Sequence, residues 1–267
     1  MQDSNLLWQL HGLAFSHGRQ PVFNSLDLAI ERGCCYGILG PNGSGKTTLL
    51  DMLSGLLPPS QGTIHFCGKP LAGWSCARLA RRVGMVPQQF VVRFGFSVRD
   101  VVAMGRHPHL GRFAVMDDRD EALIAGAMDV MGIAALADRQ VTQLSGGEQQ
   151  RVAVARALAQ DTEVLLLDEA TSNLDVYHSL SILSTLRGRM KEQGLTIVAA
   201  LHDLNQAAFF CDRLLFVKQG RLVCEGPVDK VLRSEIIKEV YGVEARVRHD
   251  DFANCRQVSF RSPGEKR

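Results

Sequence analysis

The chain has 267 residues, of which 46% are hydrophobic, so it is long and apolar enough to bury a substantial core. Its 30 Lys and Arg residues nearly balance its 28 Asp and Glu residues, and a formal net charge of +2 does not point to nucleic acid or an anionic membrane surface as a partner. The longest apolar runs, residues 164–167 and 195–201, are far shorter than the ~20 residues of a membrane-crossing helix.

The N-terminus and the cysteines both predict a protein of the cytosol. Residues 1–5 lack the basic start and the long apolar stretch of a secretory signal. The seven Cys residues are odd in number, and no pair of Cys-x-x-Cys motifs is present to hold zinc. We therefore expect these residues to be small buried side chains in a reducing compartment.

The first elements expected are two β-strands, at residues 6–15 and 22–30. Both stretches alternate in polarity, and the residues between them have turn chemistry, so they predict a small antiparallel layer. A compact apolar run at residues 34–39 then leads through a Gly-rich loop into residues 47–53, whose apolar spacing suits a helix. Strand, loop and helix follow one another here in the order of a phosphate-binding motif.

Two later stretches, residues 163–167 and 196–201, are rich in β-forming apolar residues and predict fully buried parallel strands. The region between about residues 89 and 160 instead predicts helices. Ser97 is placed to cap a helix at residues 98–104, and residues 117–131 open with acids and continue with helix formers.

The predicted fold is therefore a single α/β domain over residues 1–267. Residues 1–88 and 161–243 form a P-loop nucleotide-binding core that includes the antiparallel β-subdomain, and residues 89–160 form an inserted helical subdomain. Short strands at residues 214–217 and 222–224 and a helical stretch at residues 228–241 complete the core. Residues 244–267 are expected to be a C-terminal tail.

The Gly-rich loop carries the strongest chemical signal. It matches the P-loop pattern in full, with Gly40, Pro41, Asn42, Gly43, Ser44, Gly45, Lys46 and Thr47. Glycines let the backbone wrap around phosphate oxygens, and the following helix adds its positive N-terminal end. Lys46 is expected to bridge the β- and γ-phosphates and the Thr47 hydroxyl to bind Mg²⁺.

Polar residues follow the two predicted parallel strands. Asp168 is expected to hold Mg²⁺, and Glu169 to orient or deprotonate the attacking water. His202 ends the other strand, from which it can reach the γ-phosphate or Glu169. Gln88 has an amide able to contact Mg²⁺ or water. An isolated Asp-Glu pair would merely be the polar end of a strand, but the complete P-loop in the same chain favours the catalytic interpretation.

A second anion-binding helix end is expected where Ser145, Gly146 and Gly147 precede an amphipathic helix. This helix has no Lys-Thr pair of its own, so it predicts half of a site that another molecule completes. A Ser-capped helix after a Gly turn is the structural alternative.

Together these motifs resemble the ATPase subunits of ABC transporters, over about residues 7–243. The resemblance rests on an ordered set: the P-loop, Gln88, Leu144-Ser145-Gly146-Gly147-Glu148-Gln149, Asp168-Glu169, Ser172-Asn173-Leu174-Asp175 and His202. It implies a head-to-tail dimer that encloses two ATP molecules. The nucleotide-contacting residues that it implies beyond the P-loop are Thr48, His17, Ser145, Gly146, Gly147, Glu148 and Asp175, with Glu169, His202 and Gln88 as catalytic residues and Thr47, Gln88 and Asp168 around Mg²⁺.

Two positions depart from the family's pattern. Ala170 follows the catalytic Glu169, where the family commonly has Pro, so the loop is expected to be less rigid. His17 takes the place of the aromatic residue that stacks on adenine, and imidazole offers a smaller face for stacking.

The branch of the family is indicated by two segments. Residues 104–113 and 226–243 resemble the corresponding segments of importers for iron-siderophores, haem and cobalamin. Residues 90–96 are apolar and aromatic, which suits either a groove for a helix of a membrane partner or the core of the helical subdomain. His107 and His109 alone do not predict a metal site, because two His residues without further ligands seldom suffice.

The resemblance implies a peripheral protein at the cytoplasmic face of the membrane. Its expected partners are a second copy of itself, integral membrane permease subunits and, indirectly, an extracytoplasmic substrate-binding protein, with no nucleic acid. Importers of molybdate or other metals and separate-subunit exporters remain alternatives. A soluble ABC ATPase acting on DNA or ribosomes is disfavoured, because the chain has one P-loop, no extended heptads and no basic stripe.

Overall fold

The computed structural model describes residues 5–111, 114–172 and 174–261. It divides into two compact units: the chain up to Gly73 together with the chain from Thr196 onward, and the intervening chain from Trp74 to Leu195. Three residues of the sequence motifs, Arg112, Phe113 and Asn173, lie outside the described residues.

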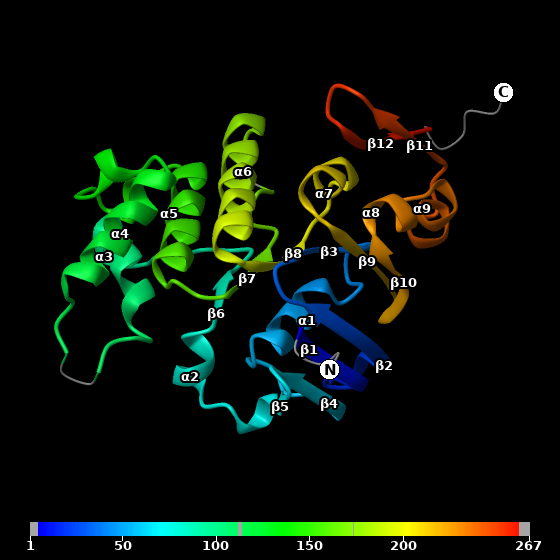
Figure 1. Cartoon of the computed structure of the whole chain (residues 1–267), viewed down its shortest axis with the longest axis horizontal. Helices are drawn as coiled ribbons and strands as arrows, with labels where there is room; N and C mark the ends of the chain where they lie inside the picture. The colour runs from blue at the N-terminus through cyan, green and yellow to red at the C-terminus, as the bar shows by residue number, and fades with distance from the viewer. Residues whose placement is uncertain (1–4, 112–113, 173, 262–267) are drawn as a thin grey trace. The chain divides into compact units, whose positions relative to one another are not determined.

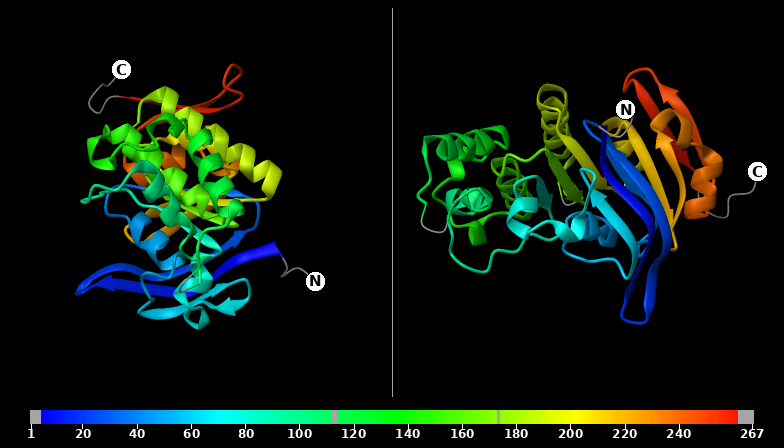
Figure 2. Two further views of the ribbon diagram at one scale, coloured as in Figure 1. Left: turned by 90° about the vertical axis from the view of Figure 1, so that its left-hand side faces the viewer. Right: turned by 60° about the horizontal axis from the view of Figure 1, so that its bottom comes forward.

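An antiparallel sheet in the first unit confirms the predicted β-subdomain. Its strand order is β2–β1–β4–β5, with β1 at Leu6–His17, β2 at Gln20–Glu31, β4 at Gln61–Phe66 and β5 at Lys69–Pro70. Figure 2 shows β1 and β2 as a long hairpin near the N-terminus. Alternating side chains bury one face of this sheet, where the rings of Trp8 and Phe66 lie 4.9 Å apart.

The first unit also contains the strand that leads into the P-loop. That strand, β3 (Cys35–Leu39), pairs in parallel with β8 (Thr196–Ala200) on one side and β9 (Arg213–Lys218) on the other, and β10 (Arg221–Pro227) is antiparallel to β9. All five residues of β3 are buried, as expected of a strand covered on both faces. Helix α1 (Lys46–Leu53) follows the loop and packs against β8.

The C-terminal tail forms structure that the sequence did not predict. After α7 (Leu204–Phe210), α8 (Val228–Val231) and α9 (Ser234–Tyr241), the strands β11 (Ala245–Asp250) and β12 (Cys255–Phe260) form an antiparallel hairpin. The side-chain amide of Asn205 on α7 donates to the carbonyl of Val258 at 3.3 Å and accepts from its backbone N–H at 2.6 Å. The Asn205 amide thus donates to and accepts from one backbone residue of β12, as a neighbouring strand would, and it fixes the hairpin to α7.

The second unit contains the predicted helical subdomain, drawn in green in Figure 1. Its helices are α2 (Cys76–Ala80), α3 (Val98–Ala103), α4 (Asp118–Val130), α5 (Gly146–Ala159) and α6 (Val176–Gln193), and the parallel strands β6 (Val83–Val86) and β7 (Val164–Asp168) complete the unit. Capping boxes open α3, α4 and α5, at Ser97, Asp117 and Ser145. Local side-chain acceptors thus set these helix starts.

Candidate nucleotide site

The P-loop runs from the end of β3 to the start of α1, and its glycines are required by close contacts or by positive φ angles. A Cβ atom on Gly40 would lie 2.0 Å from the carbonyl oxygen of Val217, and one on Gly45 would lie 2.6 Å from the ring of Phe23. Gly40, Gly43 and Gly45 all have positive φ angles, of 159°, 76° and 104°. The loop therefore has a backbone path that other residues would adopt only with strain.

The start of α1 offers donors to an anion. Within the described residues, no side chain caps this helix, and its first turn contains no acidic residue. The Ser44 hydroxyl is buried and has no hydrogen-bond partner in the described part of the chain. The buried Lys46 ammonium donates to the carbonyls of Gly40 at 2.9 Å and Pro41 at 3.2 Å. Backbone N–H groups, a hydroxyl and an ammonium at one helix end fit the phosphates of a nucleotide.

His17 lies next to the same helix. Its Nε2 atom is 3.4 Å from the Thr48 hydroxyl oxygen, and its ring meets that of Phe15 edge-on at 4.9 Å. Burial raises the pKa of the Asp51 carboxyl on α1, and the nearby His17 opposes that shift. The residue predicted to face adenine is therefore placed beside the phosphate-binding loop of the first unit.

The acidic pair of the second unit stands at the end of β7. Asp168, which is 2% exposed, is the last residue of the strand. Glu169 has a φ angle of 50°, in the left-handed region that costs a non-glycine residue about 1–2 kcal/mol. Strain of this kind is concentrated at functional sites, which supports a functional role for Glu169.

The turn after Glu169 is held from within. The carbonyl of Glu169 accepts hydrogen bonds from the backbone N–H of Ser172 at 3.0 Å and from its hydroxyl at 2.9 Å. Ala170, at the position where Pro was expected, is buried. The Gln88 amide donates to the Glu169 carboxylate, with 2.7 Å between Nε2 and Oε2. The structure thus brings together two of the three predicted catalytic residues within the second unit.

The N-terminal end of α5 is closed by its own side chains. The Ser145 hydroxyl donates to Glu148 Oε2 at 2.7 Å and accepts from the Glu148 backbone N–H at 3.3 Å, while the Ser145 N–H donates to the same carboxylate at 2.8 Å. These hydrogen bonds hold the pKa of Glu148 below its usual range. Glu148 is therefore an anion at neutral pH, next to Gly146 and Gly147.

Asp175 caps α6 and is held by a residue that the sequence motifs did not single out. Its carboxylate accepts from the backbone N–H of His178 at 2.8 Å and lies 2.9 Å from the ring Nδ1. These contacts hold the pKa of Asp175 below its usual range. The spacing of an Asp followed three residues later by a His was the available signal, because N-cap side chains bond to that position.

In the first unit, His202 follows β8 and is exposed. The next residue, Asp203, caps α7 by accepting from the backbone N–H groups of Asn205 at 2.7 Å and Gln206 at 3.2 Å. These bonds fix the backbone on the C-terminal side of His202. His202 therefore lies between a buried strand and a capped helix.

Two further segments that the sequence singled out lie within the second unit. His109 donates from Nε2 to the carbonyl of Gln160 at 2.8 Å, and the described residues contain no group of three or more His, Cys, Asp or Glu residues that could hold a metal ion.

In the segment after Gln88, Val91 is 69% exposed and Phe94 is 72% exposed. The aromatic segment thus presents side chains to solvent.

The buried strand, the glycine loop and the uncapped helix with Lys46 define a P-loop protein that binds nucleoside triphosphates. The sequence profile of the family described as "ABC transporter" matches residues 23–172, more than half of the chain. The chain belongs to the ABC transporter family, and ABC ATPases bind ATP.

Three similar proteins give the comparison more detail. The cobalamin import ATP-binding protein BtuD of Halobacterium salinarum is 43% identical over 89% of this chain and 59% of its own length. A solved structure of an ABC transporter assigned to the metal-chelate type, in an inward-facing conformation, has a TM-score of 0.82 and 29% identity, and covers 97% of this chain and 98% of its own. The ATP-binding cassette MJ0796, solved as a dimer bound to ADP and Pi, has a TM-score of 0.74 and 27% identity over 83% of this chain and 99% of its own.

The chain spans only 53–59% of the length of the first curated relatives that it matches. In the part of the chain that the structure describes, no helix has both the length and the apolar character to cross a membrane.

Proposed function

We propose that this chain is the ATP-hydrolysing subunit of an ABC importer that takes up a metal chelate of the iron-siderophore, haem or cobalamin type. The observation that carries the ATPase part is the pairing of Gln88 with the strained Glu169 in a chain that also has an uncapped P-loop helix. The cargo class is supported by the 43% identity to a cobalamin import protein and by the fold shared with a metal-chelate type transporter.

The phosphates of ATP bind to the N-terminal end of α1. Lys46 neutralises the β- and γ-phosphates, and the backbone N–H groups and the Ser44 hydroxyl donate to their oxygens. Thr47, Asp168 and Gln88 offer hydroxyl, carboxylate and amide oxygens, the donor types that Mg²⁺ prefers. These residues would hold Mg²⁺, which would neutralise charge on the phosphates.

Hydrolysis adds water to the γ-phosphorus and breaks its bond to the β-phosphate oxygen, giving ADP and inorganic phosphate. Glu169 orients this water and accepts its proton, and Gln88 holds the Glu169 carboxylate in place until the nucleotide arrives. His202 donates a hydrogen bond to the γ-phosphate.

Two copies are needed for a complete site. Ser145 and Gly147 of one copy grip the γ-phosphate bound by Lys46 of the other, and Asp175 joins the two sites. ATP therefore binds the closed dimer more tightly than the open one, which is the condition for driving a conformational change. We place this dimer at the cytoplasmic face of the membrane, on permease subunits that receive cargo from an extracytoplasmic substrate-binding protein.

Glu169→Gln tests the ATPase assignment. The substitution keeps the side-chain shape and removes the base, so we expect turnover to fall by about 10³-fold while ATP binding persists. A nucleotide-bound dimer should accumulate and be visible by size-exclusion chromatography. Glu192→Gln, an exposed change on α6, is the control and should keep the parent rate. Turnover by Glu169→Gln at the parent rate would refute the assignment.

The cargo class is tested with the membrane protein that copurifies with this chain. In liposomes that also contain the substrate-binding protein, ATP hydrolysis should be stimulated by a ferric siderophore, haem or cobalamin. Stimulation by molybdate alone would replace the cargo class and leave the ATPase assignment intact.

A further inference from the structure

The segment between α3 and α4 contains a buried cation that the nucleotide site does not use. This cation is Arg106, the last residue of the 3-10 helix η3 (Met104–Arg106), and its side chain is 5% exposed. A buried guanidinium is costly unless it is paired and hydrogen-bonded. Its partners therefore reveal what holds this segment in place.

The partners of Arg106 lie on two different helices. Its Nε atom donates to Asp120 Oδ1 on α4 at 2.7 Å. Its Nη1 atom donates to the carbonyls of Ala159 at 2.8 Å and Gln160 at 3.1 Å, which are the last residue and the C-cap residue of α5. A cation at this end also complements the negative pole of the helix. Arg106 thus caps the C-terminal end of α5 from a segment more than fifty residues earlier.

The backbone of the same segment lies directly against α5. A Cβ atom on Gly105 would come within 2.2 Å of the Arg156 carbonyl oxygen, so no side chain fits there. His109 donates to the Gln160 carbonyl at 2.8 Å, and the Gln160 side chain donates to the carbonyl of Val83, which opens β6, at 3.2 Å. The end of α5 is therefore bound on several sides.

The negative partner of Arg106 is itself fixed. Asp120 is buried and takes part in the capping box that opens α4, where its Oδ2 atom accepts from the backbone N–H of Asp117 at 3.2 Å. The hydrogen bond from Arg106 holds the pKa of Asp120 below its usual range. Arg106 consequently joins the start of α4, through an ion pair, to the end of α5, through hydrogen bonds to its last carbonyls.

The opposite end of α5 carries Ser145 and Gly147. A helix of 14 residues is about 21 Å long, so a tilt of about 5° at one end moves the other by roughly 2 Å. A displacement of about 1 Å is enough to lower a rate by about 10²-fold where groups must meet a transition state. The orientation of α5 therefore affects how closely Ser145 and Gly147 can approach a γ-phosphate.

We propose that Arg106 is a positioning residue that, by binding the last carbonyls of α5 and the Asp120 carboxylate, aims Ser145 and Gly147 at the ATP of the partner subunit. This inference rests on the proposed function, because it needs two copies that share a nucleotide. It also assigns a role to the segment whose sequence resembles that of chelate importers.

The experiment measures dimer formation at saturating ATP in the Glu169→Gln background, where hydrolysis does not intervene. Arg106→Lys keeps the charge but replaces the planar fork, so it cannot reproduce all three contacts. We expect its dimer fraction to fall to about one tenth of the parent's, with the ATP affinity of the monomer unchanged within about twofold. If Arg106 only stabilised the unit, the substitution would lower the melting temperature, and dimer fraction and ATP affinity would fall together.

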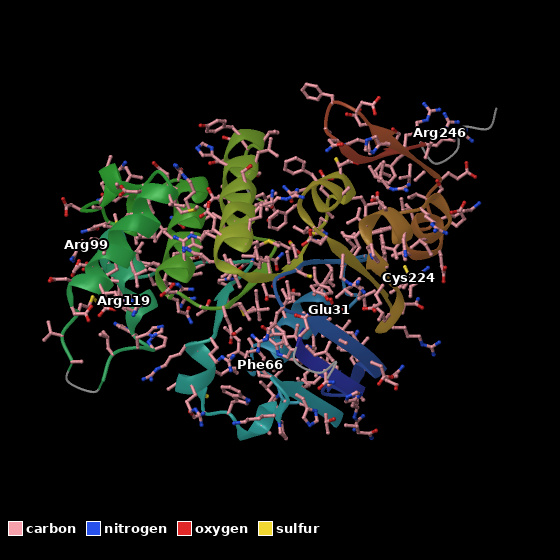
Figure 3. The ribbon with its side chains drawn as sticks, in the orientation of Figure 1. Glu31, Phe66, Arg99, Arg119, Cys224 and Arg246 are labelled. Carbon is pink, nitrogen blue, oxygen red and sulfur yellow. The ribbon has the colours of Figure 1, made fainter. Side chains whose placement is uncertain are left out.

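The matched control is Arg99→Met. Arg99, labelled in Figure 3, pairs with Glu121 of α4 from α3, but this pair is about half exposed. Because exposed pairs contribute little, the control should dimerise as the parent does.

Asp120→Asn is the second variant. It removes the countercharge and one of the two acceptor oxygens, which bind Arg106 and the Asp117 N–H, and it leaves the carbonyl contacts of Arg106. We expect its dimer fraction to fall by about threefold. The positioning role would be overturned if Asp120→Asn dimerised as the parent does and Arg106→Lys either did the same or failed to fold. If the Glu169→Gln parent itself stays monomeric with ATP, the proposed function fails, and that result is distinct from any effect of Arg106.

Discussion

The two helix ends that the sequence predicts as anion sites differ in how their donors are used. At α1, the described residues provide no side-chain cap, the buried Ser44 hydroxyl has no partner among them, and the Lys46 ammonium donates to the Gly40 carbonyl of the loop. At α5, Ser145 and the anionic Glu148 already satisfy each other. A phosphate can bind the first end directly, but at the second it must displace an internal hydrogen bond beside a negative charge.

This difference gives a physical reason for a shared site. The end of α5 is a poor binding site for a free anion, and it becomes useful only when another subunit holds the phosphate in place. Mutations should therefore be able to change ATP binding at α1 without changing the contact between α5 and the partner's γ-phosphate, and the reverse.

The largest effect is expected at α1. Lys46→Met removes the ammonium that neutralises the phosphates, so we expect the dissociation constant for ATP to rise by about 10²-fold or more. Fluorescent ATP binding to the isolated chain measures this directly. Binding as tight as in the parent would show that the phosphates do not occupy the P-loop.

Ser145→Arg should affect only the second end. Its bulk and charge stand where the partner's phosphate must approach, so we expect turnover to fall by about 10²-fold while the monomer binds ATP as the parent does. Steady-state kinetics measures the turnover, fluorescent ATP measures binding by the monomer, and size-exclusion chromatography measures ATP-dependent dimerisation. Normal ATP-dependent dimerisation would contradict a composite site and the comparison between the two ends.

Local sequence patterns predicted much of the fold and the candidate site. The glycine spacing of the P-loop and the caps at Ser97 and Ser145 are encoded within a few residues, and the structure has all of them. The left-handed backbone of Glu169 was not predictable, because a non-glycine residue rarely adopts a φ angle of 50°.

Other features depend on residues that are distant in the sequence. The hairpin of β11 and β12 was missed because its short, mostly polar strands are held by Asn205, about fifty residues earlier. Arg106 appears in the sequence as one more surface cation, and only its contacts with Asp120 and Ala159 show that it is buried.

The smallest effect is expected at Ser44, where substitution should weaken ATP binding without lowering the stability of the chain. The hydroxyl is buried without a partner among the described residues, so Ser44→Ala should leave the melting temperature unchanged or slightly higher. The same change removes a donor to phosphate, and we expect KM for ATP to rise by about threefold.

Ser179→Ala is the matched comparison, because the buried Ser179 hydroxyl donates to the Thr171 carbonyl at 3.3 Å, and its loss should lower the melting temperature. If Ser44→Ala destabilised the chain as much as Ser179→Ala while KM stayed constant, Ser44 would be a structural residue and the α1 end would be less open than we infer.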